Sequence, residues 1–327
     1  MKLLIVSNNP WRASFRQRIE IHLERLRSCG IESEVVRLPR GLAGRLKLFR
    51  SVGKFDGVML HKRQLNRFEA SWLSRSARKV VCEYDDAIMY KKNNPSRVNH
   101  REQRSFERAV RLADMVIVGN SYLAEHAGRF NDNVVIIPTG LDVSEYEARK
   151  REKQDSIVRL VWIGSKSTLK YLARIRPELE QIGRAFDNVR LRIIADKFME
   201  CENIPVEKCV WSLERQAADL AECDIGLAPL PDNKFTRGKC GFKILQYGAA
   251  GLCVAASPVG VNSKYVTEGV NGFLPETSGQ WVERLSSMIK DENLRTRMGV
   301  EAHTRAKGFD VRIVGERLVR AVKSCLG

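Results

Sequence analysis

The chain has 327 residues and a formal net charge of +17 at pH 7, and this length fits two domains better than one. Hydrophobic residues make up 43% and charged residues 29%, which is ordinary for a globular protein and excludes a disordered or collagen-like chain. No apolar run approaches the length of a membrane-spanning helix. The stretch 1–9 lacks a long apolar core and a small-residue cleavage site, so it predicts a first strand rather than a signal peptide.

Short apolar runs alternate with helical patterns through the first half. A helical pattern covers 15–28 and ends at Gly30. The strand-like runs are 2–7, 31–38, 56–61, 79–84, 114–119 and 134–138. Continuous apolar runs separated by helices predict a parallel sheet that is covered on both faces.

The alternation restarts after a polar stretch, 147–155, which we interpret as a linker. The expected strands are 158–163, 189–195, 224–228 and 252–257, and the expected helices are 169–186, 215–222 and 242–250. From residue 278 onward the pattern is helical, with breaks near Asp291 and Gly308. We therefore expect two α/β units joined near residue 150, with ligands at the carboxyl ends of the strands.

Positive charge is concentrated in the first half. Between Arg12 and Lys79 the sequence has 17 basic and 6 acidic residues. Several of the basic residues are interspersed with leucine and phenylalanine: Arg37, Arg40, Arg45, Lys47, Arg50 and Lys54. Such a surface fits an anionic membrane face, and a solvated basic face without a specific partner is the alternative. Nucleic acid fits less well, because no RNA- or DNA-reading motif occurs.

The eight cysteines are scattered and form no CxxC pair. They indicate neither a zinc site nor a disulfide framework, so we expect no metal centre. Without an export signal, a reducing cytoplasm is the simplest compartment for such thiols.

The segment 229–258 carries the clearest chemical pattern. It begins after an expected strand, continues as a loop with Arg237 and Lys239, and passes Gly241 into a helix that starts near Phe242. Glycines before a helix N-terminus let backbone N–H groups approach an anion, and the helix dipole favours the negative charge. The segment predicts a phosphate cradle, with an ordinary basic loop as the alternative.

Several stretches combine an expected strand or helix with a turn of small residues. They are ADMVIVGNSYL (113–123), VVIIPTGLD (134–142), VRLVWIGS (158–165), DIGLAPLPD (224–232), FKILQYGAAGLCVAASPVG (242–260) and EGVNGFL (268–274). Together they resemble the family-4-type retaining glycosyltransferases of the GT-B fold, and the match is more specific in the second half.

The resemblance implies two Rossmann-like domains that face a central cleft. Residues 1–150 would hold the acceptor, and residues 151–308 would hold a nucleotide-sugar donor. Residues 309–327 would form a helix that crosses back to the first domain. It also implies that the nucleotide-sugar is a substrate and that no cofactor is needed.

The family's donor site maps onto this chain with departures. Its two glutamates, which contact the donor sugar and the ribose hydroxyls, fall on Gly238 and Gln246. The arginine that binds the diphosphate falls on Ser165, while Lys170 has the spacing of the family's lysine. The expected diphosphate contacts are Ser165, Lys166, Lys170, Lys239, Gly241, Phe242 and Lys243. For Lys243, a solvated helix position is the alternative.

The first domain offers candidates for the acceptor side. The loop after the first strand contains Asn9, Arg12, Ser14 and Arg16, although Ser14 also fits a helix N-cap. Asp85 and Asp86 follow an expected strand, and adjacent residues of an extended chain point to opposite sides. One would orient or deprotonate an acceptor hydroxyl, unless both cap a helix or pair with basic residues. His61 is either a base or a hydrogen-bonded structural histidine.

These expectations combine into a glycosyltransferase that moves a sugar from a nucleotide-diphosphate sugar to a glycan or lipid-linked acceptor. Retention of configuration follows from the resemblance, whereas a role in cell-surface polysaccharide or glycoconjugate synthesis is inferred from the basic charge of the first half. The alternatives are a GT-B-fold sugar-nucleotide epimerase and an inactive nucleotide-sugar-binding homologue. We expect a cytoplasmic protein that binds the inner face of the cytoplasmic membrane through its basic half.

Overall fold

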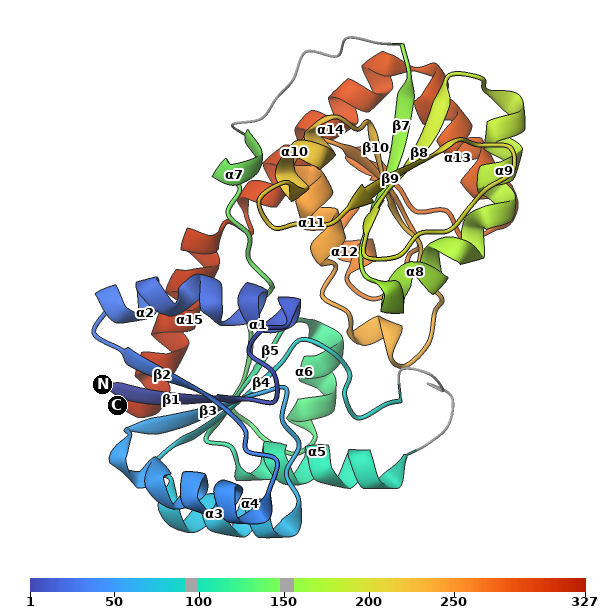
Figure 1. Cartoon of the computed structure of the whole chain (residues 1–327). Helices are drawn as coiled ribbons and strands as arrows, with labels where there is room; N and C mark the ends of the chain where they lie inside the picture. Colours follow the sequence, from blue (N-terminus) through green and yellow to red (C-terminus); the bar gives the residue numbers. More distant parts are fainter. Residues whose placement is uncertain (92–98, 148–155) are drawn as a thin grey trace. The chain divides into compact units, whose positions relative to one another are not determined.

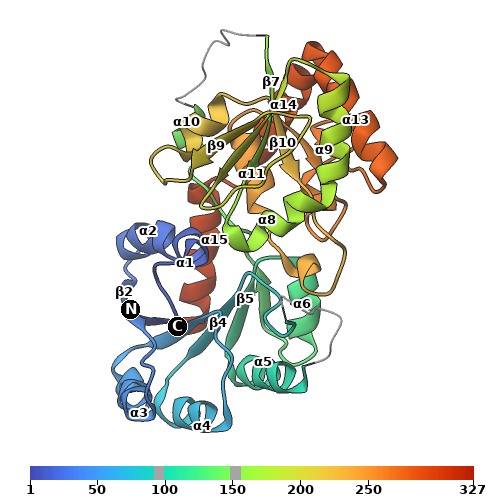
Figure 2. The same cartoon turned by 45° about the vertical axis from the view of Figure 1, so that its right-hand side comes forward.

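The computed structural model describes residues 1–91, 99–147 and 156–327. It divides into two compact units (Figures 1 and 2). Unit 1 comprises residues 1–140, 233–240 and 311–327, and unit 2 comprises residues 141–232 and 241–310. The boundary therefore falls at Gly140 instead of residue 150, and all but the first residue of the expected linker lies outside the described residues.

Unit 1 is built on a sheet of six parallel strands in the order β2-β1-β3-β4-β5-β6. The strands are β1 (Lys2–Ser7), β2 (Glu32–Arg37), β3 (Gly57–His61), β4 (Val80–Tyr84), β5 (Met115–Val118) and β6 (Val134–Ile136). The register places Ser7, at the end of β1, between Arg37 of β2 and His61 of β3. The carboxyl ends of these three strands therefore lie side by side.

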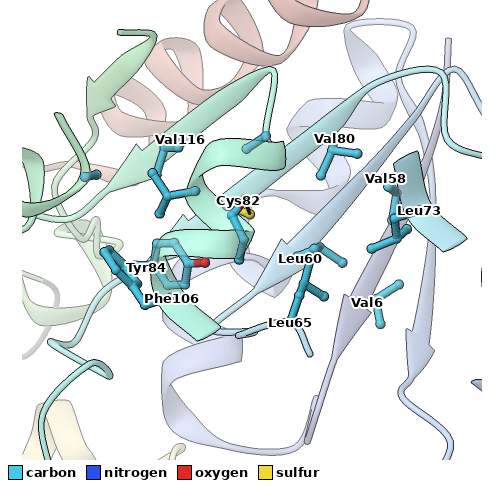
Figure 3. Close-up of a cluster of buried hydrophobic side chains, with 14 of the residues drawn as sticks. Val6, Val58, Leu60, Leu65, Leu73, Val80, Cys82, Tyr84, Phe106 and Val116 are labelled. Carbon is cyan, nitrogen blue, oxygen red and sulfur yellow. Dashed lines mark hydrogen bonds between the residues drawn. The ribbon is translucent and has the colours of Figure 1, made fainter. Parts of the chain in front are cut away.

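Helices cover both faces of this sheet (Figure 1). They are α1 (Ala13–Arg18), α2 (Leu23–Ser28), α3 (Leu42–Ser51), α4 (Arg67–Ser76), α5 (His100–Leu112), α6 (Ser121–Gly128) and α15 (Val311–Leu326). Alternate residues of each strand face opposite sides of the sheet, because successive side chains of a strand point in opposite directions. Leu4 and Val6 pack with residues of α3, α4 and α5. Figure 3 shows Val6 in this cluster with Leu73 of α4 and Phe106 of α5. Leu3 and Ile5 pack with α1, α2 and α15, so the C-terminal helix completes the core of unit 1.

Unit 2 contains a second parallel sheet, in the order β12-β11-β10-β7-β8-β9. Its strands are β7 (Val158–Ile163), β8 (Val189–Ala195), β9 (Val206–Val210), β10 (Ile225–Ala228), β11 (Cys253–Ala256) and β12 (Gly272–Phe273). Counted from β7, this is the strand order of a dinucleotide-binding Rossmann sheet. The prediction of two Rossmann-like units is confirmed.

The helices of unit 2 also lie on both faces (Figure 1). They are α7 (Ser144–Glu147), α8 (Lys166–Leu172), α9 (Arg176–Ala185), α10 (Gln216–Ala221), α11 (Phe242–Ala249), α12 (Asn262–Tyr265), α13 (Ser278–Lys290) and α14 (Glu292–Lys307). Leu160 and Trp162 pack with α8, α9 and α13. Val161 and Ile163 pack with α7, α10 and α11. Among the described residues, no helix is long and apolar enough to cross a bilayer.

Two long helices expected from periodicity are interrupted in the structure. The expected helix at 15–28 is divided by a 3-10 turn, Glu20–His22, into α1 and α2. The one expected at 169–186 begins earlier, at Lys166, and is divided by the turn Ala173–Ile175 before α9. Pro177 stands in the first turn of α9, where a residue without an N–H group starts a helix well but cannot continue one.

Candidate functional site

The two sheets each have one place where the strand order reverses, and such a point opens a ligand site at the carboxyl ends of the strands. In unit 1 it lies between β1 and β3, which end at Ser7 and His61. In unit 2 it lies between β7, which is followed by Gly164, and β10, which ends at Ala228. Most of the predicted site residues lie at these edges.

An ion cluster occupies the edge of unit 1. The Lys62 ammonium lies 2.7 Å from Asp85 Oδ1 and 2.5 Å from Asp86 Oδ2. The expectation that these adjacent carboxylates point to opposite sides is wrong, because β4 ends at Tyr84 and the chain bends there. Burial opposes ionisation of Asp86, but the neighbouring Lys239 and Lys62 outweigh it and lower the pKa of Asp86 well below its usual range.

Residues 233–240 belong to this edge, although the sequence assigned them to the donor domain. Lys239 Nζ lies 3.0 Å from Asp86 Oδ1. The Asn120 side-chain amide donates to the Gly238 carbonyl at 2.9 Å. The Cys240 thiol donates to the Asp85 carbonyl at 3.1 Å. These contacts attach the segment to unit 1 and explain why the boundary between the units is discontinuous.

Gly238 is enclosed by the backbone of unit 1. A Cβ atom at this position would lie 2.6 Å from the Cβ of Ala87 and 2.9 Å from its backbone nitrogen. Real Cβ contacts are not this short. Gly238, on which the first glutamate of the resembled family falls, therefore has no room for a side chain.

A buried polar network lies behind the ion cluster. The His61 Nδ1 atom lies 3.1 Å from Ser7 Oγ, and its Nε2 atom lies 3.6 Å from Glu83 Oε2. The Arg18 guanidinium donates to Glu83 at 2.7 Å. Burial lowers the pKa of His61 to about 4, so its ring is neutral at pH 7. Burial also raises the pKa of Glu83 to about 7, although Arg18 opposes this shift.

The loop after β1 holds the other acceptor-side candidates. Asn9 accepts a hydrogen bond from the Trp11 amide at 3.1 Å, which forms a local turn. Helix α1 begins at Ala13 with Arg12 at its N-cap, so the alternative of Ser14 as the cap is wrong. Arg16 lies in the last turn of the same helix.

At the edge of unit 2, helix α11 starts beside the end of β7. Gly241 caps the helix with φ +62°, a left-handed conformation that favours glycine. The Lys243 ammonium donates to the Ile163 carbonyl and lies 4.4 Å from the centre of the Trp162 ring. Lys243 is therefore not a solvated helix position. A Cβ at Gly164 would lie 2.6 Å from the Lys243 ammonium, so this glycine leaves the space that Lys243 uses.

The remaining diphosphate candidates surround the start of α8. Ser165 is the N-cap of this helix, and the Lys166 amide donates to Asp196 Oδ1 at 2.5 Å. A carboxylate thus already occupies this helix N-terminus. Lys170 is exposed, with its ammonium 5.5 Å from the centre of the Tyr171 ring. The backbone at Gly241 and Phe242, together with Lys243, is better placed to bind an anion.

Gln246 is 4% exposed and contacts two polar residues that the sequence did not indicate. Its amide donates to the Tyr146 hydroxyl at 3.1 Å and to Gln216 Oε1 at 3.2 Å. Gln216 Oε1 also accepts from the Trp211 indole at 3.3 Å. Trp211 follows β9, an edge strand with charged residues and no continuous apolar run, so no pattern predicted where it would lie.

Solved structures with this fold have low sequence identity to the chain. Anabaena HepE in complex with UDP and glucose is 18% identical, with a TM-score of 0.73 over 99% of this chain and 100% of that chain. Sucrose-phosphate synthase from Thermosynechococcus elongatus is 12% identical, with a TM-score of 0.77 over 99% and 98% of the two chains. WaaG, a glycosyltransferase involved in lipopolysaccharide biosynthesis, is 13% identical, with a TM-score of 0.67 over 97% and 98%.

No protein-family model and no curated protein sequence matches the chain. The likeness to solved glycosyltransferases extends over nearly the whole chain, and it confirms the fold that the resemblance implied.

Proposed function

We propose that the protein is a nucleotide-sugar-dependent glycosyltransferase. The observation that carries the proposal is the edge of unit 2, where the capped N-terminus of α11 and the Lys243 ammonium converge on the end of β7. Backbone amides and a cation at a strand switch point suit the diphosphate of a leaving nucleotide. The proposal is supported by Anabaena HepE, which has been solved with UDP and with UDP-glucose.

In this proposal, the donor diphosphate binds the amides of Gly241 and Phe242 and the ammonium of Lys243. Lys170, which is exposed on α8, supplies a second cation, and Ser165 and Lys166 border the site. Charge develops on the diphosphate as the sugar leaves, so cations fixed beside it stabilise the transition state more than the ground state. Gln246 contacts the ribose.

Lys239 has a different role from the one expected. Its ammonium already neutralises Asp86 and belongs to unit 1. We assign it to holding the segment 233–240 on the acceptor-side unit.

The acceptor binds at the edge of unit 1, beside the ion cluster. With a strongly lowered pKa, Asp86 is a poor proton acceptor at neutral pH. Orientation of an acceptor hydroxyl by Asp85 and Asp86 therefore fits the geometry better than general base catalysis. Neutral His61 packs behind them and holds Ser7 in place. Transfer with retention, without a protein nucleophile, is consistent with this arrangement.

The exposed rim of unit 1 suits a lipid-linked acceptor at an anionic membrane. Trp11, Leu42 and Phe68 are 72%, 66% and 68% exposed and follow the three strands whose ends lie together. The Arg37 guanidinium lies 5.2 Å from the centre of the Trp11 ring. Exposed arginines lie within a few residues of these apolar side chains in the sequence: Arg12, Arg37, Arg40 and Arg67. We call this surface the basic rim, and propose that it binds the inner face of the cytoplasmic membrane.

The experiment is a thermal-shift panel of UDP-, GDP-, ADP- and dTDP-sugars, followed by product analysis with and without glycan and lipid-linked acceptors. A ligand that binds the native state raises the unfolding temperature by mass action, so a selective shift identifies the donor. Transfer to an acceptor supports the proposal. An epimerised sugar-nucleotide formed without acceptor, or binding without any turnover, contradicts it and identifies one of the two alternatives.

A further inference from the structure

Four polar side chains of unit 2 form one chain of hydrogen bonds. The Trp211 indole nitrogen lies 3.3 Å from Gln216 Oε1, and Gln246 Nε2 lies 3.2 Å from the same oxygen. Gln246 Nε2 also lies 3.1 Å from the Tyr146 hydroxyl. Trp211 directly follows β9, and the other three residues come from α10, α11 and α7. We call these four hydrogen-bonded residues of unit 2 the relay.

The indole fixes the direction of every hydrogen bond in this relay. An indole N–H group can only donate, so Gln216 must turn its carbonyl oxygen toward Trp211. That oxygen then requires a second donor, and Gln246 must turn its NH₂ group toward it. The NH₂ group has two hydrogens, and Gln216 and Tyr146 accept them both. The orientation of each amide thus follows from the chemistry of its neighbour.

The carbonyl oxygen of Gln246 is the group left over. Within the described part of the chain it accepts no hydrogen bond from another side chain. Gln216, Gln246 and Tyr146 are 8%, 4% and 4% exposed. Turning the Gln216 amide around would leave buried donors facing one another, and turning the Gln246 amide around would leave its carbonyl oxygen facing that of Gln216. The relay therefore holds Gln246 with an acceptor, not a donor, available for a ligand.

We propose that Trp211 and Gln216 are positioning residues that present the Gln246 carbonyl oxygen to a ribose hydroxyl of the donor nucleotide. This inference rests on the proposed function, which assigns Gln246 to the ribose. A hydroxyl donates to this oxygen as it would to a carboxylate. The relay therefore lets a neutral glutamine bind the ribose at the position where the glycosyltransferase family that the sequence resembles has a glutamate. The relay is also what makes glutamate itself unsuitable here.

The test is a double-mutant cycle at pH 8 with Gln246→Glu and Trp211→Phe. In Gln246→Glu, the carboxylate faces the Gln216 oxygen, and Gln216 cannot turn without placing its NH₂ group against the indole N–H. Trp211→Phe removes the indole donor, so Gln216 turns and donates to the carboxylate. The double variant should therefore fold and bind nucleotide about tenfold more favourably than the combined effects of the two single variants predict. A difference of this size is within the range of coupling between residues of one network.

Two readouts are measured: the folding equilibrium constant in urea without ligand, and the Kd of whichever of UDP, GDP, ADP and dTDP binds the wild type. The matched control is Trp281→Phe combined with Gln246→Glu, because Trp281 is a buried tryptophan of α13 outside the relay. The inference is supported if Trp211→Phe and Gln246→Glu are coupled in both readouts while Trp281→Phe and Gln246→Glu have additive effects.

The outcomes separate the relay from the function. Additive effects of Trp211→Phe and Gln246→Glu on folding overturn the relay, whether or not a nucleotide binds. Coupling in folding with additive effects on Kd overturns the positioning role. If the wild type binds none of the four nucleotides, the proposed function fails and the assignment of the relay to ribose fails with it.

Discussion

The Lys239 ammonium lies 3.0 Å from a carboxylate oxygen of Asp86, a residue 153 positions earlier in the chain. Both side chains are 24% exposed, so the pair is partly shielded from solvent. Together with the Asn120 amide on Gly238, it attaches a loop that follows β10 of unit 2 to the edge of unit 1. A basic residue that the sequence placed beside a phosphate is thus a structural contact of the other unit.

Lys239→Ala should lower the free energy of unfolding by about 1.5–3 kcal/mol, as expected for a hydrogen bond to a charged group. Urea denaturation measures this, and a cycle with Asp86→Asn isolates the pair. Lys170→Ala is the matched control, because this lysine is exposed and should leave stability unchanged. Unchanged stability in Lys239→Ala, with a weaker affinity for nucleotide, would return Lys239 to the diphosphate site.

Gly238→Ala should destabilise the protein by about 1–3 kcal/mol, because the added methyl group meets the backbone and Cβ of Ala87. Gly128→Ala is the control in the same unit. A Cβ there meets nothing within 4 Å, so stability should stay the same or rise slightly. If the double variant Gly238→Ala with Ala87→Gly recovers part of the lost stability, the contact with Ala87 is the cause. Equal stability of Gly238→Ala and the control Gly128→Ala would disprove the close contact.

Stability should fall as the pH falls from about 6.5 toward 4, partly because of His22. Burial, with a smaller effect of Arg18, lowers the pKa of His22 to about 4. The unfolded chain therefore binds a proton at this residue before the folded chain does, which favours unfolding in that window. Between pH 8 and pH 5, this histidine should account for about 2 kcal/mol.

His22→Gln removes this contribution and keeps a polar side chain of similar reach. We expect its unfolding free energy, measured in urea, to fall less between pH 8 and pH 5 than that of the wild type. His61, whose pKa is lowered in the same direction, keeps part of the pH dependence in both proteins. An identical pH dependence in the variant would show that His22 is not held neutral.

The basic rim predicts binding to vesicles that contain phosphatidylglycerol, with weaker binding to neutral vesicles and at high salt. The double variant Trp11→Ser with Phe68→Ser should bind several-fold more weakly in a sedimentation assay, because interfacial binding scales with buried apolar area. Val210→Ser, which changes an equally exposed apolar residue of unit 2, should bind like the wild type. Equal binding of all three proteins would remove the rim as a membrane contact.

The regular elements could be predicted because buried parallel strands have continuous apolar runs. β7 and β8 have the bounds expected from the sequence. β9 was missed because an edge strand does not need such a run, and the position of Trp211 was lost with it. The positions of Asp85, Asp86 and His61 at strand ends could be predicted from the sequence. Their partners could not, since ion pairs such as Arg18 with Glu83 connect residues far apart in sequence.

Lys243→Met tests the anion site of unit 2. The ammonium lies at the end of β7 through its bond to Ile163 and its contact with Trp162, and methionine keeps the side-chain stem but not the charge. Hydrogen bonds to charged groups are worth about 1.5–3 kcal/mol, so the Kd for the nucleoside diphosphate should rise about tenfold or more.

Lys290→Met, at an exposed lysine of α13, is the control and should keep the wild-type Kd. Titration calorimetry compares the three proteins with the diphosphate and with the matching nucleoside. Because the nucleoside lacks the phosphates that Lys243 would contact, its affinity should be the same in all three, and an equal loss for both ligands would place Lys243 outside the diphosphate site.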